Sequence, residues 1–210
     1  MLLVDAPLTL REFVTSESLP LATIFREVLG FLASRPDAVV FGAHAVNAYC
    51  EPERMTADID ILSPDASRLA DDVRAFIGER FHIAVRVREV ASRGFRVYQL
   101  RQPKNRHLVD VRQVDRLPVH RVFEGVQVLE PTELLAMKVL SMVARKDREK
   151  GLSDRLDVHR LLRAFPELRT DTGDVTSRLR ALGADEAVLV AWADVVSQML
   201  APDGNDDVDF

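Results

Sequence analysis

Asp58 and Asp60, two aspartates separated by one residue, have the clearest potential for chemistry in this chain. Apolar Ile59 and Ile61 alternate with them, which predicts a strand from Ala57 to Leu62. Side chains two positions apart on a strand share a face, with Cβ atoms about 6.5–7 Å apart, so both carboxylates could bind a divalent cation. Two carboxylates on one face also repel each other, so we expect a cation beside them or a strong structural reason for their position.

A third carboxylate, Asp110, lies between apolar residues in the predicted strand from His107 to Val114. A carboxylate in apolar surroundings is unfavourable unless it binds a cation or accepts hydrogen bonds. Three such groups holding Mg²⁺ or Mn²⁺ would suit phosphoryl transfer, and Asp110 could also deprotonate an attacking hydroxyl. The alternative is a surface position on a strand of alternating charge.

The segment before the aspartates could bind an anion. A short apolar run ends at Gly42, which predicts a strand, a tight turn and then a helix from Ala43 to Cys50. Free backbone N–H groups at such a helix start suit a nucleotide phosphate. Arg54 and Thr56 could contact phosphate or support the aspartates structurally, and His44 is interpreted as a packing residue.

Four short motifs carry a family resemblance. Gly42 and Ala43, followed by the segment Arg54–Asp60, resemble the nucleotidyltransferase signature of a Gly-Gly or Gly-Ser turn and Asp-x-Asp, with alanine as a departure. The segment Lys138–Arg145 resembles a Lys-Leu-x-Ala-x-x-x-Arg motif with two departures. Ser153–Val158 resembles Arg-Asp-x-x-Asp-Leu, with serine in place of the basic residue. In this order the motifs resemble the AbiEii-type branch, which includes toxins of toxin–antitoxin and phage-defence systems.

The resemblance implies an α/β (α+β) fold with a nucleotidyltransferase-like mixed β-sheet flanked by helices, and a helical C-terminal half. It also implies that Asp58, Asp60 and Asp110 bind Mg²⁺ or Mn²⁺, and that a lysine and an aspartate of the next helix serve the active site. The predicted catalytic residues are Asp58, Asp60, Asp110, Lys138 and Asp157. The predicted nucleotide-binding residues are Gly42, Ala43, Arg54, Thr56, Lys138, Arg145 and Asp154.

Lys138 lies among apolar residues of its predicted helix, and Arg145 follows two turns later on nearly the same face. A lysine in such a position needs a carboxylate or a phosphate. Asp154 and Asp157, three residues apart, share one side of the next predicted helix. The alternative to a role in the active site is therefore a salt bridge that joins the two helices.

The function implied by the resemblance is transfer of a nucleoside monophosphate from a nucleoside triphosphate to an acceptor hydroxyl. RNA, including the tRNA 3′ end, is the favoured acceptor, and a protein or a small molecule is the alternative. The protein would act as a toxin with an antitoxin partner. The Ala43 and Ser153 departures motivate an alternative, a non-catalytic module that uses the fold for binding or as a scaffold. A DNA-binding regulator is disfavoured by the net charge of −5 and the lack of a helix-turn-helix or zinc pattern.

Periodicity predicts an α/β core over residues 1–128, a helical subdomain over 129–201 and a disordered acidic tail over 202–210. Basic residues predominate from Arg86 to Arg121, which could face phosphates or form the solvated outer face of a sheet. A single cysteine, Cys50, excludes an intrachain disulfide and fits a reducing compartment. With no signal peptide and no apolar segment of roughly 20 residues, we expect a cytoplasmic protein without membrane contact.

Overall fold

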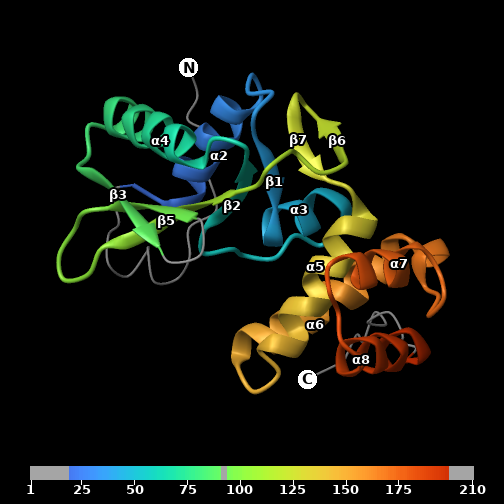
Figure 1. Cartoon of the computed structure of the whole chain (residues 1–210). Coiled ribbons are helices and arrows are strands. Elements are labelled where there is room, and N and C mark those ends of the chain that lie inside the picture. The colour runs from blue at the N-terminus through green and yellow to red at the C-terminus, as the bar shows by residue number, and fades with distance from the viewer. Residues whose placement is uncertain (1–18, 91–93, 199–210) are drawn as a thin grey trace, which may run out of the picture. The chain divides into compact units, whose positions relative to one another are not determined.

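A computed structural model of the chain describes residues 19–90 and 94–198 (Figure 1). The predicted acidic tail, residues 202–210, lies outside these ranges. The chain divides into two compact units, one of residues 1–48 and 52–130 and one of residues 49–51 and 131–210. The first contains the sheet and the second is helical.

The described part of the first unit contains a seven-stranded sheet in the order β3-β4-β5-β2-β1-β7-β6. Strand β2 is parallel to β5 and β1 is parallel to β7, while the other neighbours are antiparallel. The sheet is therefore mixed, as the sequence predicts. The strands are β1 (Val39–Phe41), β2 (Ile59–Ser63), β3 (Val85–Val90), β4 (Gly94–Gln99), β5 (Arg106–Gln113), β6 (His120–Phe123) and β7 (Val126–Leu129).

Helices α2 (Leu21–Leu32) and α4 (Ala66–Phe81) lie on the same face of this sheet (Figure 1). Their apolar residues recur at helical spacing, which places one side of each helix in the core. Asp65 caps α4 by accepting a hydrogen bond from the backbone N–H of Arg68. The core they cover includes the fully buried side chains of Ile24, Leu69, Ile77, Ile59, Ile61, Val109 and Val111.

The alternation of β2 and β5 sends their charged residues to the opposite face. Isoleucines of β2 and valines of β5 point into the core, so Asp60 and Asp110 point away from it. Strand pairing places Phe41, Asp60, Asp110 and Arg96 side by side across β1, β2, β5 and β4. Paired residues on adjacent strands share a face, so these four side chains form one row on the face without α2 and α4.

Strand β5 contains an irregularity next to this row. Val97 pairs with Val109, but the next residue of β4, Tyr98, pairs with His107 instead of Leu108. Leu108 is thus an extra residue, as in a β-bulge. The bulge turns His107 to the same face as Asp110, although residues three positions apart on a regular strand point to opposite faces.

The helical unit contains α5 (Pro131–Ala144), α6 (Glu149–Ala164), α7 (Asp174–Ala181) and α8 (Glu186–Ser197), with a short 3₁₀ helix at Pro166–Leu168. Trp192 is 1% exposed, and its indole N–H donates to the Thr176 hydroxyl at 3.0 Å. The aliphatic residues around Trp192 in the sequence predict a core position for it, which is confirmed. No described helix has the length and apolarity needed to cross a membrane.

Two strand boundaries differ from the sequence prediction. Strand β2 begins at Ile59, not Ala57, because its pairing with β5 starts at Ile59 and Val109. The alternation from His82 to Val90 predicts a strand that begins at His82. Strand β3 begins instead at Val85, because α4 continues to Phe81 and ends at His82 in the left-handed conformation. Asp58 therefore lies just before a strand instead of within it.

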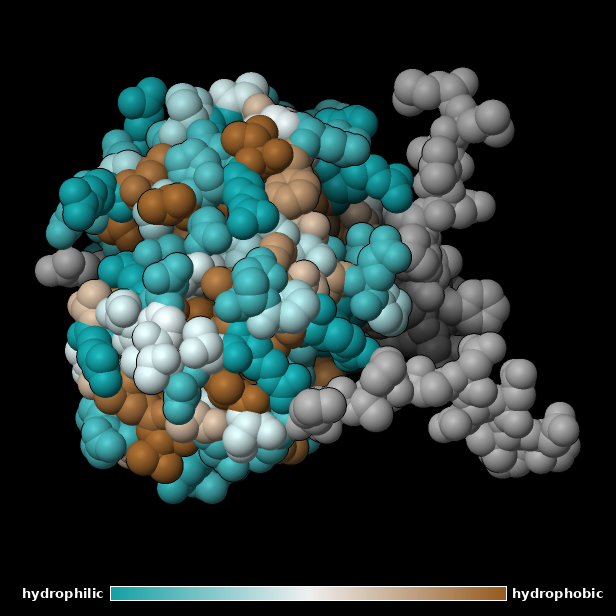
Figure 2. All heavy atoms as spheres, turned by 90° about the vertical axis from the view of Figure 1, so that its right-hand side faces the viewer, coloured by the Kyte–Doolittle hydropathy of each residue, from teal (hydrophilic) through white to brown (hydrophobic). Residues whose placement is uncertain are grey.

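Figure 2 shows one face of the molecule, on which hydrophobic side chains form separate patches among hydrophilic ones. Isolated exposed apolar residues of this kind are normal for a folded protein. The chemistry of the first unit is therefore better sought in its charged residues.

Candidate active site

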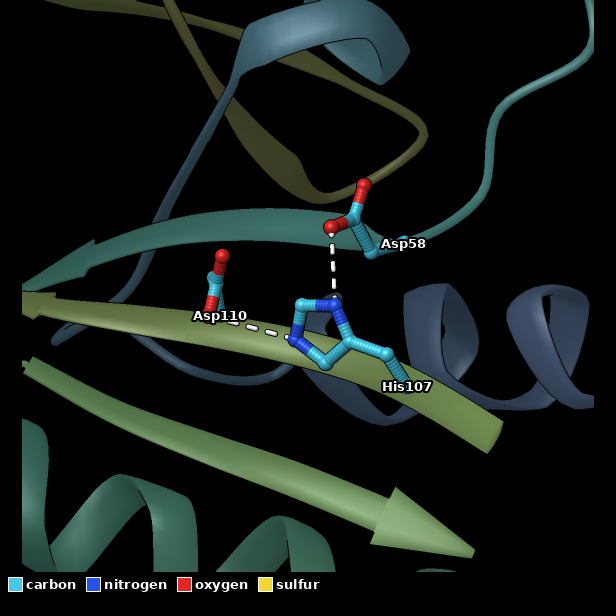
Figure 3. Close-up of side chains that lie close together, drawn as sticks. All are labelled: Asp58, His107 and Asp110. Carbon is cyan, nitrogen blue, oxygen red and sulfur yellow. Dashed lines mark hydrogen bonds and ion pairs between the residues drawn. The ribbon is translucent and has the colours of Figure 1, made fainter. Parts of the chain in front are cut away.

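The structure brings Asp58, His107 and Asp110 together on the sheet face without α2 and α4 (Figure 3). The His107 ring lies between the two carboxylates, with Nδ1 3.0 Å from Asp58 Oδ2 and Nε2 3.2 Å from Asp110 Oδ1. Asp58 precedes β2 and His107 lies near the start of β5, so the parallel pairing of these strands brings both residues to the same end. These three side chains form a group that could hold a metal ion.

The charges in this group stabilise one another. Burial lowers the pKa of His107, but its hydrogen bonds to Asp110 and Asp58, together with the charges of both carboxylates, outweigh burial and raise the pKa to about 10. Burial raises the pKa of Asp110, but the hydrogen bond from His107 and the charges of His107 and Arg96 lower it below its usual range. Arg96 Nε donates to Asp110 Oδ1 at 2.8 Å. The protonated imidazole thus supplies positive charge next to the aspartates, at the place where the repulsion of the carboxylates predicts a cation.

Asp60 lies next to Asp110 in the strand register, but its carboxylate contacts the turn after β1. A Cβ atom added to Gly42 would lie 2.1 Å from Asp60 Oδ2, so the carboxylate packs directly against the glycine. Gly42 also has φ +70°, a conformation that favours glycine. The glycine of the sequence motif thus has a structural reason. Gly42 makes the turn into α3 (Gly42–Tyr49) and leaves room for the Asp60 carboxylate.

Thr56, one of the predicted nucleotide-binding residues before Asp58, contacts His44. The Thr56 hydroxyl lies 2.7 Å from His44 Nε2, and the Phe25 ring packs edge-on against the His44 ring. Burial lowers the pKa of His44 to about 4, and the nearby negative charge of Asp58 opposes this only in part. His44 is therefore a neutral packing residue near pH 7. Its contacts agree with the structural role expected for it.

Arg54 is fixed through its backbone. Its N–H donates to Asn47 Oδ1 at 3.1 Å, and its carbonyl accepts from Asn47 Nδ2 at 2.7 Å. The Arg54 guanidinium donates to the carbonyl of Met55 at 3.3 Å. Asn47 of α3 thus holds the segment that leads to Asp58. Ala43, the residue after Gly42, lies in the first turn of the same helix.

In the helical unit the residues of the third and fourth motifs form a buried ion-pair cluster. Lys138 Nζ lies 2.7 Å from Asp157 Oδ2 and 3.1 Å from Asp154 Oδ1, and Arg145 lies 2.8 Å from Asp154 Oδ2. Arg160 lies 3.8 Å from Asp157 Oδ1. The shared face of the two aspartates is confirmed, and the salt bridges of the alternative interpretation are present. A role of these residues in nucleotide binding stays a prediction.

The position of His107 between the two carboxylates is not predictable from the sequence. The run His107 to Val114 gives no sign that Leu108 is an extra residue, because the bulge exists only in the pairing with β4. The only available signal was the presence of a histidine three positions before a candidate metal ligand. On a regular strand that spacing places the two side chains on opposite faces.

Comparison with protein-family models and with curated protein sequences finds no match. Solved structures with a similar fold include JHP933 from Helicobacter pylori, with a TM-score of 0.55 and 15% identity over 90% of this chain and 82% of that chain. A second H. pylori protein, provisionally named a nucleotidyltransferase, has a TM-score of 0.55 and 17% identity over 92% and 86% of the two chains. The Megavirus polyadenylate synthase has a TM-score of 0.55 and 13% identity, over 79% of this chain and 38% of that chain.

At these identities the similarity is one of fold. The fold is that of the nucleotidyltransferase-like proteins, with the mixed sheet and flanking helices that the sequence predicts. The AbiEii-type branch stays a prediction.

Proposed function

We propose that the protein is a metal-dependent nucleotidyltransferase that transfers a nucleoside monophosphate from a nucleoside triphosphate to an acceptor hydroxyl and releases pyrophosphate. The observation that carries this proposal is the meeting of Asp58 and Asp110 with His107 on one sheet face of a nucleotidyltransferase-like fold. Asp60 lies beside Asp110 in the strand register and contacts the turn at Gly42. Carboxylates next to a tight turn at a helix start provide ligands for a cation and a place for a phosphate chain.

The donor set of this face fits a divalent cation, and Mg²⁺ or Mn²⁺ are the ions expected from the sequence. Asp58 and Asp110 would hold the ion, with Asp60 beside them. Such an ion, when bound, neutralises negative charge on phosphate oxygens. Asp110 is also the proposed acceptor of the proton from the attacking hydroxyl, because its carboxylate is ionised at neutral pH.

The proposal also includes the predicted nucleotide-binding residues. We propose that the backbone of Ala43 helps to position the triphosphate. Arg54 and Thr56 are proposed to help by keeping the segment before Asp58 ordered. Lys138 and Arg145 are proposed to be required for activity together with their aspartate partners. The burial of Lys138, Asp154 and Asp157 and their ion pairs support a requirement for the cluster as a whole, because removal of one partner leaves a buried charge unpaired.

RNA is the proposed acceptor, including the tRNA 3′ end. Arg88 pairs directly with Arg96 across β3 and β4, and Arg86 pairs with Tyr98. These three arginines are exposed on the same sheet face as Asp110. Arg96 is already paired with Asp110, but the exposed Arg86 and Arg88 beside it could bind a phosphodiester chain. The similarity of fold to a polyadenylate synthase supports the same acceptor class.

The acceptor proposal has its own test. Replacement of Arg86 and Arg88 with glutamine is expected to weaken RNA binding and to reduce its salt dependence by about one unit of slope per lost phosphate contact. Arg68→Gln is the matched control, because Arg68 is an exposed residue of α4, which covers the other face of the sheet. Equal RNA binding by all of these variants would contradict the acceptor proposal.

The proposed biological role is that of a toxin with a cognate antitoxin, in the AbiEii-type branch. Expression of the wild-type chain in a bacterial host is expected to stop growth, and expression of Asp58→Asn is not. Growth that is unaffected by the wild-type chain would remove the toxin role and leave the enzymatic proposal in place.

The enzymatic proposal is tested with labelled nucleoside triphosphates, total RNA and a divalent metal. Wild type is expected to label RNA, and Asp58→Asn and Asp110→Asn are expected to lose at least about a hundredfold in rate, as when transition-state charge stabilisation is lost. Asp115→Asn, an exposed aspartate shortly after β5, is the control and should keep wild-type activity. Transfer by Asp58→Asn at the wild-type rate would refute the proposal.

A second candidate is a non-catalytic module that keeps the fold for binding. It is favoured by the closed ion pairs of Lys138 with Asp154 and Asp157, which satisfy this lysine within the helical unit. Calorimetry with each triphosphate and a divalent metal separates the candidates. Metal-dependent nucleotide binding without transfer to any acceptor would favour the module.

A further inference from the structure

The Asp58, His107 and Asp110 group differs from the all-carboxylate site that the sequence predicts. One atom from each of the three side chains, two oxygens and one nitrogen, lies within 4.8 Å of the others. These side chains are 17%, 26% and 15% exposed, so the group is accessible from solvent and still held by the sheet. The donor set therefore contains an imidazole where a third carboxylate was expected.

The position of the imidazole is built into the backbone. The extra residue Leu108 turns His107 to the face of Asp110, and the Tyr98 ring contacts the His107 ring with centroids 5.1 Å apart. One ring nitrogen faces Asp58 and the other faces Asp110. Either nitrogen thus lies near an ion held by the adjacent carboxylate. Only a deprotonated ring nitrogen can bind a metal, so an ion that binds there displaces a proton from His107.

Ligand type determines which divalent ion a site prefers. Mg²⁺ prefers oxygen ligands and keeps several water molecules. Imidazole suits the later first-row transition ions, whose affinities for sites with nitrogen and oxygen ligands rise from Mn²⁺ to Co²⁺ and beyond. A site with two carboxylates and one imidazole should therefore rank Co²⁺ above Mn²⁺ and both above Mg²⁺.

We propose that His107 is a metal ligand and that Asp58, His107 and Asp110 form a site selective for first-row transition ions over Mg²⁺. The inference deepens the proposed function by naming the class of ion at the same face. It rests on the proposed function only because both proposals use Asp58 and Asp110. Metal binding is measurable without nucleotide or acceptor, so the two proposals fail separately.

The first experiment uses the wild-type chain with Mn²⁺, Co²⁺ and Mg²⁺ as probes. Pulsed electron paramagnetic resonance of the Mn²⁺ complex is expected to show coupling to a ¹⁴N nucleus. Calorimetry is expected to give Co²⁺ an affinity at least about tenfold above that of Mg²⁺. A Mn²⁺ complex without nitrogen coupling, or equal affinities for Co²⁺ and Mg²⁺, would overturn the inference.

The second experiment compares His107→Asn with His120→Asn. His120 lies on edge strand β6 of the same sheet, where its ring bonds the Pro118 carbonyl, and it serves as the matched control. His107→Asn is expected to lose at least about tenfold in Co²⁺ affinity and to lose the nitrogen coupling, with Mg²⁺ affinity changed much less. His120→Asn is expected to bind like wild type. Unchanged Co²⁺ binding in His107→Asn would overturn the inference, and the wild-type spectrum decides the question if that variant does not fold.

Discussion

Replacement of Gly42 with alanine tests the link between the tight turn and Asp60. The backbone at Gly42 has φ +70°, which costs a residue with a Cβ atom about 1–2 kcal/mol. The new Cβ would also lie 2.1 Å from Asp60 Oδ2 and 2.9 Å from Asp60 Cγ. Ordinary contacts begin at roughly 3.5 Å, so the carboxylate must move, at a typical overpacking cost of about 1–3 kcal/mol. Gly42→Ala is therefore expected to lower the free energy of unfolding by about 2–5 kcal/mol.

A double-mutant cycle separates the two contributions. Asp60→Ala removes the colliding carboxylate and leaves only the Asp60 Cβ, 3.0 Å from the added Cβ. Gly42→Ala in that background is therefore expected to cost little more than the backbone part, about 1–2 kcal/mol. Gly183→Ala provides a reference for that part, because Gly183 has φ +80° and an added Cβ would meet no atom within 4 Å. The assay is urea unfolding followed by circular dichroism. If Gly42→Ala costs the same in both backgrounds, the contact between the turn and Asp60 does not have the proposed steric basis.

Three further predictions concern His44 of the first unit and two buried contacts of the helical unit. The folded pKa of His44, about 4, lies below its usual 6.5, so the unfolded chain binds the proton first and stability falls as pH decreases from 6.5 towards 4. Relative to His44→Asn, wild type is expected to lose about 2–3 kcal/mol between pH 7 and 4.5 in urea titrations, and a constant difference would contradict this. Lys138→Met is expected to destabilise the helical unit by about 3–5 kcal/mol because buried carboxylates lose their partner, whereas exposed Lys150→Met should lie within about 0.5 kcal/mol of wild type. Trp192→Phe leaves the buried Thr176 hydroxyl without the indole donor and is expected to cost about 1–3 kcal/mol in thermal unfolding, so an unchanged midpoint would argue against that bond.

Much of the fold follows from residues close together in the sequence. The helical spacing of apolar residues predicts α2 and α4, and the alternation of the middle segment predicts β3, β4 and β5. The mixed character of the sheet came from the family resemblance. No local pattern indicates that β2 pairs in parallel with β5 across the intervening helix and hairpin. Pairing partners are long-range properties, which periodicity does not encode.

The candidate site shows the same division. Asp58, Asp60 and Asp110 were found from their types and spacing, and the strands place Asp60 and Asp110 side by side. The carboxylate of Asp60 nevertheless contacts Gly42, and His107 lies between the other two. Both facts depend on atoms from other strands, one through the turn after β1 and one through the bulge opposite Tyr98. A spacing argument fixes which face a residue occupies, but not which neighbour its carboxylate contacts.

The charge distribution on this sheet face also bears on how a nucleotide could bind. Asp58, Asp60 and Asp110 are negative, and a triphosphate is strongly negative, so the two repel each other at short range. The positive charges nearest to the group, on His107 and Arg96, already interact with Asp110. Those two positive charges are therefore engaged and do little to attract a phosphate. A divalent ion bound by the carboxylates supplies the missing positive charge. Metal and nucleotide binding should therefore be coupled, with each raising the affinity of the other by the same factor.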